Sequence, residues 1–236
     1  MSTESSRRDF LRRTGLVAGG ALLGGHLLGE TSAYADAPSA WSRVGDIWAA
    51  AQAPVFPARQ VRVTSYGAVG DGVTDNTAAF RRAIEACAAA GGGHVVVPAG
   101  TWLTGAIHLL SNIDLHVSGG ATIKFLQDPN AYLPAVLTRF EGMELYNYSP
   151  LIYAFEQENV AVTGTGVLDG QADNAHWWPW KGSTSYGWKK GDPSQEAARN
   201  RLIAQVEAGV PVRQRVYGNG DYLRSSFIQT LSLIHI

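Results

Sequence analysis

The chain has 236 residues, of which 45% are hydrophobic and 17% charged, a composition that fits a globular protein and excludes an intrinsically disordered one. Its net charge of −1 argues against a nucleic-acid-binding protein, which needs a basic surface. The single cysteine, Cys87, excludes an intramolecular disulfide and a multi-cysteine zinc site.

Residues 1–35 have the features of an export signal. Arg7 and Arg8 precede an apolar stretch, residues 14–28, that is too short and too weakly hydrophobic to span a membrane. A small-x-small cleavage pattern follows at Ala33-Tyr34-Ala35. The segment resembles a twin-arginine signal, so we expect the twin-arginine export machinery to deliver the protein to the periplasm or the cell exterior, without a stable membrane anchor.

The next segments are short and rich in turn-forming residues. Residues 36–59 hold three prolines and a small apolar patch, which predicts a linker or an N-terminal arm. A brief strand is predicted at 61–63. Three glycines and two aspartates over 66–76 then predict tight turns.

A helix is predicted from about residue 77 to residue 90. Apolar side chains recur on one face at helical spacing, at Phe80, Ala83, Ile84 and Cys87. The residues that can cap its N-terminus are Thr74, Asp75 and Asn76. Because Cys87 lies on the apolar face, we predict a small buried hydrophobe rather than a nucleophile.

Beyond the helix, short β-rich runs alternate with turn signals. The predicted strands are 94–97, 101–103, 106–109, 113–117, 121–125, 151–155, 160–163 and 167–169. A sandwich would favour longer strands joined by hairpins, whereas short strands with other corners favour a parallel β-helix in which each coil pairs with the next. We therefore predict an all-β solenoid over 60–230. Because its first coil would expose unpaired backbone groups, the helix at 77–90 is expected to cap it.

The ordered motifs of this region resemble those of glycoside hydrolase family 28, the polygalacturonases and their relatives. The motifs are YGAVGDGVTDNT (66–77), GGHVVVPAGTW (92–102), TGAIHL (104–109), NIDL (112–115), GTGVLDGQ (164–171), HWWPWK (176–181) and YLRSSFI (222–228). The last of them departs from the family at Ser225, where a proline is usual. The resemblance implies a right-handed parallel β-helix of the pectin lyase type. It also implies a secreted enzyme that hydrolyses galacturonosyl linkages of pectic polysaccharide with inversion and without a cofactor.

Inverting hydrolysis needs a carboxylic acid and a carboxylate base about 6.5–9.5 Å apart. The family supplies these from Asn-x-Asp and Asp-Asp motifs, with Gly-His-Gly and Arg-x-Lys motifs nearby. The sequence has no Asp-Asp, Gly-His-Gly or Arg-x-Lys, and no Asn-x-Asp is expected in a suitable strand. We therefore expect no catalytic residue within this chain and predict that the chain as given is inactive.

The end of the chain predicts a truncation. Residues 231–236, LSLIHI, are one translation of CTGTCTCTTATACACATC, a transposon-end adapter used in sequencing libraries. We expect these residues to be an artefact and the β-helix to be cut at its C-terminal side. A naturally short β-helix would instead leave an apolar terminal strand as a bare edge, which proteins usually avoid.

The predicted substrate-binding residues are Trp177, Trp178, Trp180 and Lys181. Aromatic faces stack on sugar rings and lysines attract uronate carboxylates, so this loop is a candidate wall of a polygalacturonate cleft. The alternative is a loop that packs its tryptophans on the outside of the coils. The helix predicted at 196–206 is interpreted as a surface insertion.

Other candidates have simpler interpretations. Asp169 and Asp173 could form a carboxylate pair, but an aspartate at a Gly-rich turn more often bonds backbone donors. The spacing of His94, His108 and His116 does not suit a compact metal site, and no metal ligand is predicted.

Two other functions remain open. One is a polysaccharide lyase on the same scaffold, often calcium-dependent, although no carboxylate cluster for calcium is evident. The other is a non-catalytic carbohydrate-binding or adhesive β-helix.

Overall fold

The computed structural model describes residues 40–50 and 53–232. The predicted signal, residues 1–35, lies outside the described residues. The chain divides into two compact units, Met1–Gln52 and Ala53–Ile236. In the first unit, a short 3-10 helix, η1 (Ala40–Arg43), leads into helix α2 (Val44–Ala50). No helix among the described residues is long and apolar enough to cross a lipid bilayer.

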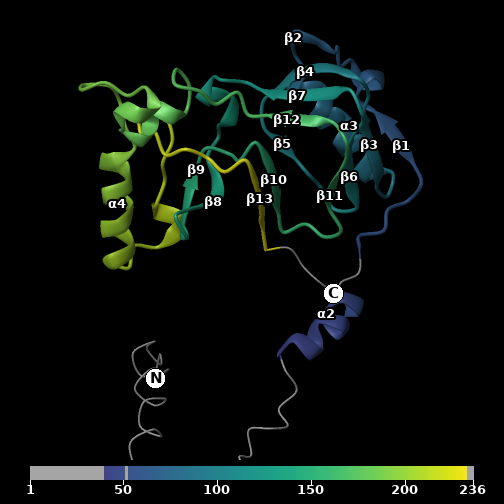
Figure 1. The fold of residues 1–236 in the computed structure, drawn as a ribbon, viewed down its shortest axis with the longest axis horizontal. Coiled ribbons are helices and arrows are strands. Elements are labelled where there is room, and N and C mark those ends of the chain that lie inside the picture. The colour runs from purple at the N-terminus through teal and green to yellow at the C-terminus, as the bar shows by residue number, and fades with distance from the viewer. Residues whose placement is uncertain (1–39, 51–52, 233–236) are drawn as a thin grey trace, which may run out of the picture. The chain divides into compact units, whose positions relative to one another are not determined.

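Three parallel sheets form the body of the second unit (Figure 1). Sheet 1 contains β1 (Gln60–Arg62), β3 (Gly93–Val97), β6 (Ile113–Val117) and β11 (Ala161–Gly164). Sheet 2 contains β2 (Asp71–Asp75), β4 (Gly100–Thr104), β7 (Ala121–Phe125) and β12 (Val167–Asp169). Sheet 3 contains β5 (Ile107–His108), β10 (Ile152–Phe155) and β13 (Ile228–Leu231).

The chain visits the sheets in a repeating order, and each visit adds a strand beside the previous one. Coil 1 contributes β1 and β2, coil 2 contributes β3, β4 and β5, coil 3 contributes β6, β7 and β10, and coil 4 contributes β11, β12 and β13. All of these pairings are parallel. The predicted stacking of short parallel strands is therefore confirmed.

Aliphatic side chains at matching positions stack to form the core. In sheet 3, Ile107, Ile152 and Ile228 are partners in adjacent strands. Ile107 and Ile152 are each 1% exposed, whereas Ile228 of coil 4 is 48% exposed. Sheet 1 repeats the arrangement with Val95, Leu115 and Val162. Each interior residue is thus covered by the coils on either side of it, and coil 4 is covered on one side among the described residues.

One corner requires glycine. Gly164 has φ +99°, and a Cβ atom there would overlap the carbonyl oxygen of Val117 in the coil beside it. The missing side chain lets the backbones of coils 3 and 4 approach closely where β11 ends.

Helix α3 (Thr77–Ala89) closes the start of the stack. It buries the apolar face that the sequence predicted, Phe80, Ala83, Ile84 and Cys87, together with Ala79. These side chains join one core cluster with the interior residues of coils 2 and 3. Burial raises the pKa of the Cys87 thiol, as expected for an inert core cysteine.

The cap of α3 differs in detail from a standard one. Asn76 occupies the N-cap position, but the Asp75 carboxylate, at 2.9 Å, accepts the hydrogen bond from the Thr77 backbone N–H. The Asn76 amide instead donates to the carbonyl oxygens of Val69 and Leu103 and accepts from the Val69 N–H. The Asn76 side chain thus links the segment before β2 to β4.

Two insertions interrupt the coils: one contains the helix predicted at 196–206, which is confirmed, and the other is an antiparallel hairpin that the sequence did not predict. An antiparallel hairpin, β8 (Val136–Phe140) and β9 (Met143–Asn147), lies between β7 and β10, and helix α4 (Glu196–Glu207) lies between β12 and β13. Both insertions leave the coils at the corner from sheet 2 to sheet 3, and so they lie together on one side (Figure 1).

The two insertions share a second, smaller core. Its buried members are Phe140, Leu145, Ala198, Leu202, Tyr217 and Leu223. The hairpin was missed because its two-residue turn, Glu141-Gly142, has the positive φ angles of a type I′ turn (48° and 84°) without the usual Asn-Gly or Asp-Gly pair. Four short 3-10 helices follow β7 in the described chain: η3 (Pro129–Tyr132), η4 (Trp178–Lys181), η5 (Thr184–Tyr186) and η6 (Val212–Gln214).

Smaller differences occur at the two ends of the described coils. The strand expected at 61–63 is β1 at 60–62, and Val63 opens a 3-10 helix, η2 (Val63–Tyr66). Part of the segment expected to form only turns is strand β2. At the other end Leu231, the first residue of the expected artefact, is buried as the last residue of β13.

Candidate functional site

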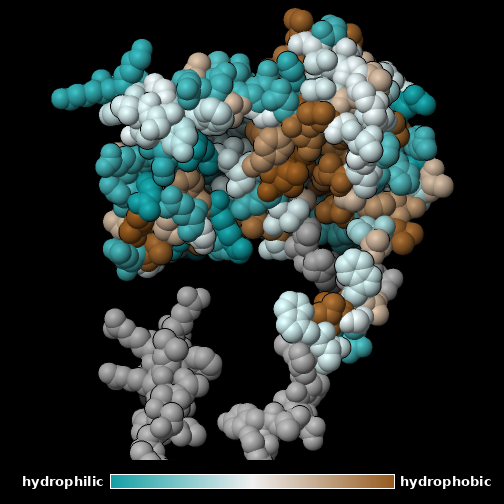
Figure 2. All heavy atoms as spheres, in the orientation of Figure 1, coloured by the Kyte–Doolittle hydropathy of each residue, from teal (hydrophilic) through white to brown (hydrophobic). Residues whose placement is uncertain are grey.

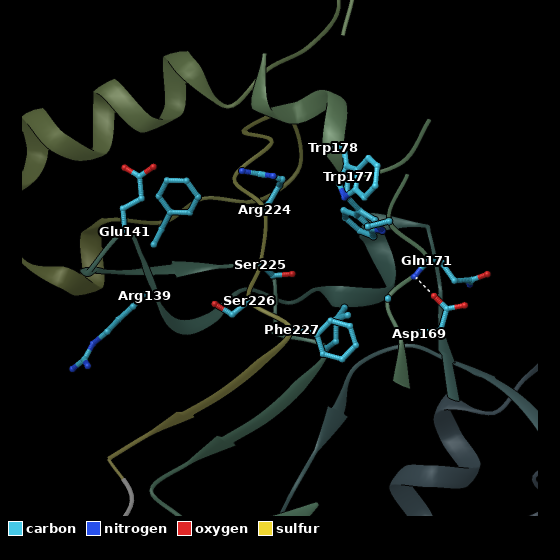
Figure 3. A pocket seen from close by; sticks show the side chains of 14 residues that line it. Arg139, Glu141, Asp169, Gln171, Trp177, Trp178, Arg224, Ser225, Ser226 and Phe227 are labelled. Atoms are coloured by element: carbon cyan, nitrogen blue, oxygen red, sulfur yellow. Dashed lines mark hydrogen bonds between the residues drawn. The ribbon is translucent and has the colours of Figure 1, made fainter. Parts of the chain in front are cut away.

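A pocket of about 570 Å³ lies where the insertions meet coils 3 and 4 (Figure 3). The pocket is lined by Arg139, Phe140 and Glu141 of the hairpin, by Leu151, by Asp169 at the end of β12, by Gly170, Gln171, Ala172, Trp177 and Trp178 of the loop that follows, and by Arg224, Ser225, Ser226 and Phe227 before β13. The pocket therefore depends on three segments that are far apart in the sequence.

Trp177 and Trp178 form an aromatic wall of this pocket. Trp178 is 43% exposed and its ring centroid lies 6.4 Å from that of Tyr186. Trp177 packs edge-on against Tyr132 at 5.6 Å and against Trp180 at 5.1 Å. Trp178 is thus held so that part of its ring remains accessible, an arrangement suited to stacking on a sugar ring.

The other two predicted binding residues lie elsewhere. Trp180 is surrounded by Trp177, Tyr148 and Tyr222 and packs against the main core. Its open side lines a separate hollow of about 320 Å³ that includes Lys189. Lys181 is exposed and lines neither hollow. The structure brings Trp177 and Trp178 together in one pocket and leaves Trp180 and Lys181 outside it.

The charged residues of the pocket differ in how they are paired. Arg139 forms an ion pair with Glu144 at 2.9 Å, and the Glu141 carboxylate accepts from Arg199 of α4 at 2.7 Å. Arg224 has no ion pair with a described residue, and its Nε donates to the Gln195 side-chain carbonyl at 3.3 Å. The pocket therefore contains a cationic group whose charge is not neutralised by a neighbour.

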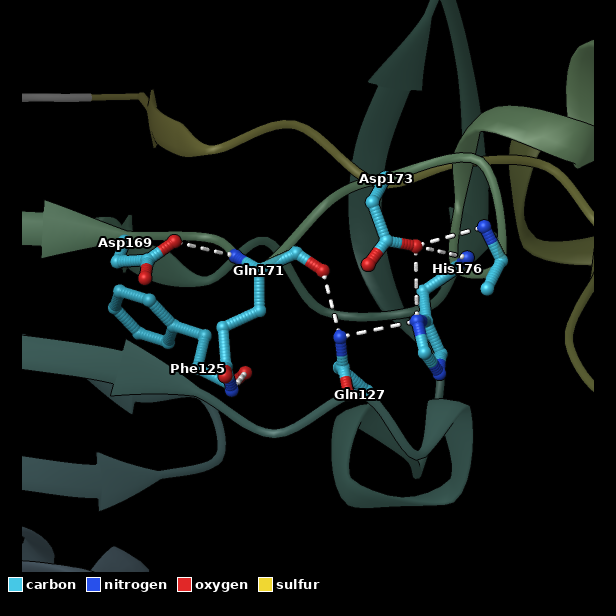
Figure 4. Close-up of polar contacts among 7 residues, drawn as sticks. Phe125, Gln127, Asp169, Gln171, Asp173 and His176 are labelled. Atoms are coloured by element: carbon cyan, nitrogen blue, oxygen red, sulfur yellow. Dashed lines mark hydrogen bonds and ion pairs between the residues drawn. The ribbon is translucent and has the colours of Figure 1, made fainter. Parts of the chain in front are cut away.

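A hydrogen-bond network fixes the loop that carries the two tryptophans (Figure 4). Asp169 accepts from the Gln171 backbone N–H at 2.9 Å, and the Gln127 side chain donates to the Gln171 carbonyl oxygen at 2.9 Å. Asp173 accepts from the backbone N–H groups of Ala175 and His176.

These contacts decide whether Asp169 and Asp173 form a carboxylate pair or bond backbone donors at turns. The hydrogen bond from the Ala175 backbone N–H stabilises the ionised carboxylate and is the main reason that the pKa of Asp173 is lowered. Both aspartates bond backbone donors at turns, as the structural interpretation predicted, and only Asp169 lines the pocket.

The three histidines of the strands do not line this pocket, and each bonds to a different partner. His94 contacts Asp114 at 2.7 Å, His108 contacts Ser149 at 2.9 Å, and His116 contacts Thr163 at 2.9 Å. Burial lowers the pKa of His108. In residues 40–50 and 53–232 no group of three His, Cys, Asp or Glu side chains is placed to hold a metal ion.

One Asn-x-Asp triplet leads into a strand, but its setting does not suit catalysis. Asn112-Ile113-Asp114 enters β6. However, Asp114 is 2% exposed and its carboxylate accepts from Thr163 as well as facing His94. Asp114 belongs to a row of hydrogen-bonded polar side chains across sheet 1, with His94 and Thr163, and does not line the pocket.

The sequence reasoning missed the cationic side of the pocket. Arg224 stands within the YLRSSFI motif, so a signal was available, but the motif alone does not show that this side chain reaches a pocket. Arg139 and Glu141 carried no signal, because they reach the pocket through the hairpin, whose position depends on the second core.

Comparisons with known proteins agree with the architecture. Residues 60–127 match the family model described as Rhamnogalacturonase A/epimerase, pectate lyase-like. A crystal structure of a hyperthermoactive exopolygalacturonase from Thermotoga maritima is 57% identical, with a TM-score of 0.75, over 76% of this chain and 40% of that chain.

Two relatives found by sequence are more distant. An exo-poly-alpha-D-galacturonosidase of Dickeya chrysanthemi is 29% identical over 63% of this chain and 23% of its own length. The "Probable polygalacturonase" of Vitis vinifera is 33% identical over 51% of this chain and 26% of its own length. The chain thus spans about a quarter of the length of these two relatives.

Two kinds of observation agree on the relatives of this chain. One is the architecture, with stacked parallel sheets and helix α3 at one end, and the other is the order of the motifs together with the similarity to the Thermotoga maritima enzyme. The second unit has the stacked parallel sheets of the pectin lyase-like β-helix fold, and the chain is homologous to polygalacturonases over the part that it shares with them.

Proposed function

We propose that the protein is a secreted hydrolase that cleaves galacturonosyl linkages in pectic polysaccharide. The observation that carries the proposal is the pocket itself, in which an accessible tryptophan and an unneutralised arginine lie at the junction of the insertions and the coils. An aromatic face suits the sugar ring and a guanidinium suits the carboxylate of a uronate. The similarity to exopolygalacturonases supports action at a chain end.

Hydrolysis with inversion would need two carboxyl groups separated by about 6.5–9.5 Å. The pocket contains two, but Glu141 is bound to Arg199 and Asp169 is bound to the Gln171 backbone. Neither is arranged as a free acid and base pair. We therefore propose that the catalytic carboxylates lie on a further coil and that the pocket binds the sugar beside them.

The exposed end of coil 4 supports such a coil. Among the described residues β11, β12 and β13 are edge strands on their outer sides, and apolar side chains gather inside the ring that they form (Figure 2). Unpaired strand edges beside an apolar interior favour the addition of a parallel strand to each sheet. In this proposal the whole solenoid is right-handed, and each coil after the first contributes one strand to each of the three sheets.

The test compares the 236-residue chain with the product of the complete gene. Both are incubated with polygalacturonate and with neutral galactan, and reducing ends and product length are measured. The gene product is expected to release monogalacturonate from polygalacturonate, with inverted anomeric configuration by NMR, and the 236-residue chain is expected to release none. An unsaturated product would identify a lyase, and binding without cleavage by the gene product would identify a carbohydrate-binding protein. Either result would overturn the proposal.

Export by the twin-arginine pathway is part of the proposal and is tested separately. Replacing Arg7 and Arg8 by lysine should leave the protein in the cytoplasm, as seen by cell fractionation. Unchanged export of the double variant would remove this part without affecting the enzymatic part.

A further inference from the structure

We propose that Arg224 binds the carboxylate of a uronate sugar and that helix α4 sets the charge of the pocket for this anion. The inference rests on the proposed function and identifies the group that selects galacturonate over neutral galactose. It assigns a role to α4, which lies outside the coils and has no place in the parallel sheets.

The guanidinium of Arg224 is available for a ligand. It is half-buried, it lines the pocket, and its hydrogen bond to Gln195 uses Nε. Arginine has five N–H donors in a planar fork, so the donors on the two terminal nitrogens remain. Two parallel N–H groups can bind both oxygens of a carboxylate, a geometry that lysine cannot offer.

Gln195 holds this arginine without neutralising it. Gln195 is 3% exposed and precedes α4 at the N-cap position, where its N–H donates to the Trp180 carbonyl oxygen at 2.7 Å and its own carbonyl oxygen accepts from the Arg199 N–H at 2.8 Å. These backbone bonds fix the residue from which the side-chain amide reaches Arg224. An amide oxygen orients a guanidinium but carries no charge, so the positive charge stays free for the ligand.

The same helix removes a competing negative charge. Glu141 lines the pocket, and without a partner its carboxylate would repel a uronate and compete for Arg224. Arg199, one turn into α4, binds it at 2.7 Å. Arg139 is likewise occupied by Glu144. Among the arginines that line the pocket, Arg224 is the one outside an ion pair of described residues.

The first experiment measures binding of trigalacturonate and of neutral galactotriose to the purified chain by calorimetry. The parent chain should prefer trigalacturonate. Arg224→Met should weaken trigalacturonate binding about 10- to 100-fold, as expected for a lost charge-assisted hydrogen bond, and should not affect galactotriose. Arg213→Met, which removes an exposed arginine of η6 outside the pocket, is the matched control and should change neither affinity.

A second set of variants tests the role of α4 with the Arg224 side chain retained. Gln195→Glu keeps the shape of the side chain and adds a carboxylate beside Arg224, and so it should lower trigalacturonate affinity at least tenfold. Arg199→Met should lower it about 3- to 10-fold by freeing Glu141, and the added change Glu141→Gln should restore it. Circular dichroism confirms the fold of each variant.

The outcomes separate this inference from the proposed function. If trigalacturonate binding is unaffected by Arg224→Met and Gln195→Glu, or if galactotriose binds equally well to the parent chain, the inference is wrong and a pectic hydrolase remains tenable. If neither sugar binds and the complete gene product does not cleave polygalacturonate, the proposed function is wrong and the inference falls with it.

Discussion

At the scale of single residues, the aromatic loop after β12 combines two roles that its sequence does not distinguish. Trp178 faces the pocket and remains partly exposed, whereas Trp180 is enclosed by three other aromatic side chains. The two tryptophans are two positions apart in one 3-10 helix, so they point in different directions. The same residue type therefore serves ligand contact in one case and packing in the other.

The first prediction separates these roles in the active protein. Trp178→Ala should raise KM on oligogalacturonate about tenfold, because a stacking contact of about 1–1.5 kcal/mol is lost, and should leave the melting temperature nearly unchanged. Trp180→Ala is the comparison and should lower the free energy of unfolding by up to about 3 kcal/mol. Steady-state kinetics and thermal melting measure the two effects, and an unaltered KM for Trp178→Ala would exclude that residue from the cleft.

The second prediction concerns acid stability. Asp71 accepts from the backbone N–H groups of Thr74 and Val73 and from the Thr74 hydroxyl, and these bonds lower its pKa from 3.8 to about 2. Because folding favours the ionised carboxylate, its contribution is present above about pH 4 and is lost as the pH falls towards 2. Asp71→Asn should reduce the pH dependence of the melting temperature between pH 4 and 2. An identical pH profile for the variant would show that this turn does not govern acid stability.

At the scale of elements, α3 shows how a solenoid ends. The helix places its apolar face against the first coils. Without it, the apolar interior of these coils would be open to solvent at this end of the stack. The amphipathic pattern predicted the buried residues correctly, because a helix that covers a flat end needs only one apolar face.

The third prediction tests this lid. Phe80→Asp places a carboxylate at a site that is 1% exposed and should destabilise the chain by more than about 4 kcal/mol, with aggregation through the uncovered end. Arg81→Asp adds the same side chain at the neighbouring exposed position and should remain soluble. Light scattering after size-exclusion chromatography distinguishes the two, and a soluble, normally melting Phe80→Asp protein would contradict the role of α3.

At the scale of the whole molecule, the corner between sheets 2 and 3 is where the fold departs from a plain stack of coils. Coil 2 crosses this corner within Gly105 and Ala106, whereas coils 3 and 4 each insert long segments there. Because successive coils lie side by side, insertions at the same corner become neighbours and share a core. The pocket follows from this stacking.

The fourth prediction concerns the exposed end of coil 4. Ile228 faces the interior of the stack and is 48% exposed, next to three strand edges that no other described strand pairs with. The purified 236-residue chain should therefore self-associate as its concentration rises, and Ile228→Lys should reduce the association. Analytical ultracentrifugation measures both. Gln229→Lys, on the opposite face of the same strand, is the control and should self-associate like the parent chain.

The sequence by itself determined the parallel stacking, the lid and most strand positions. These depend on local signals: β6, β7 and β12 coincide with their predicted ranges, and the apolar face of α3 is the predicted one. Short-range patterns of apolar residues and glycines are sufficient here, since each strand pairs with the equivalent strand one coil away.

Only the tertiary structure decided which side chains meet in the pocket. Arg224, Glu141 and Trp178 come from three segments, and their meeting depends on the hairpin, the position of α4 and the shared second core. Such contacts leave no periodic trace in the sequence, because the insertions are positioned by packing between distant residues and not by local preference. The same packing turned Trp180 and Lys181 away from the pocket and left Arg224 within it.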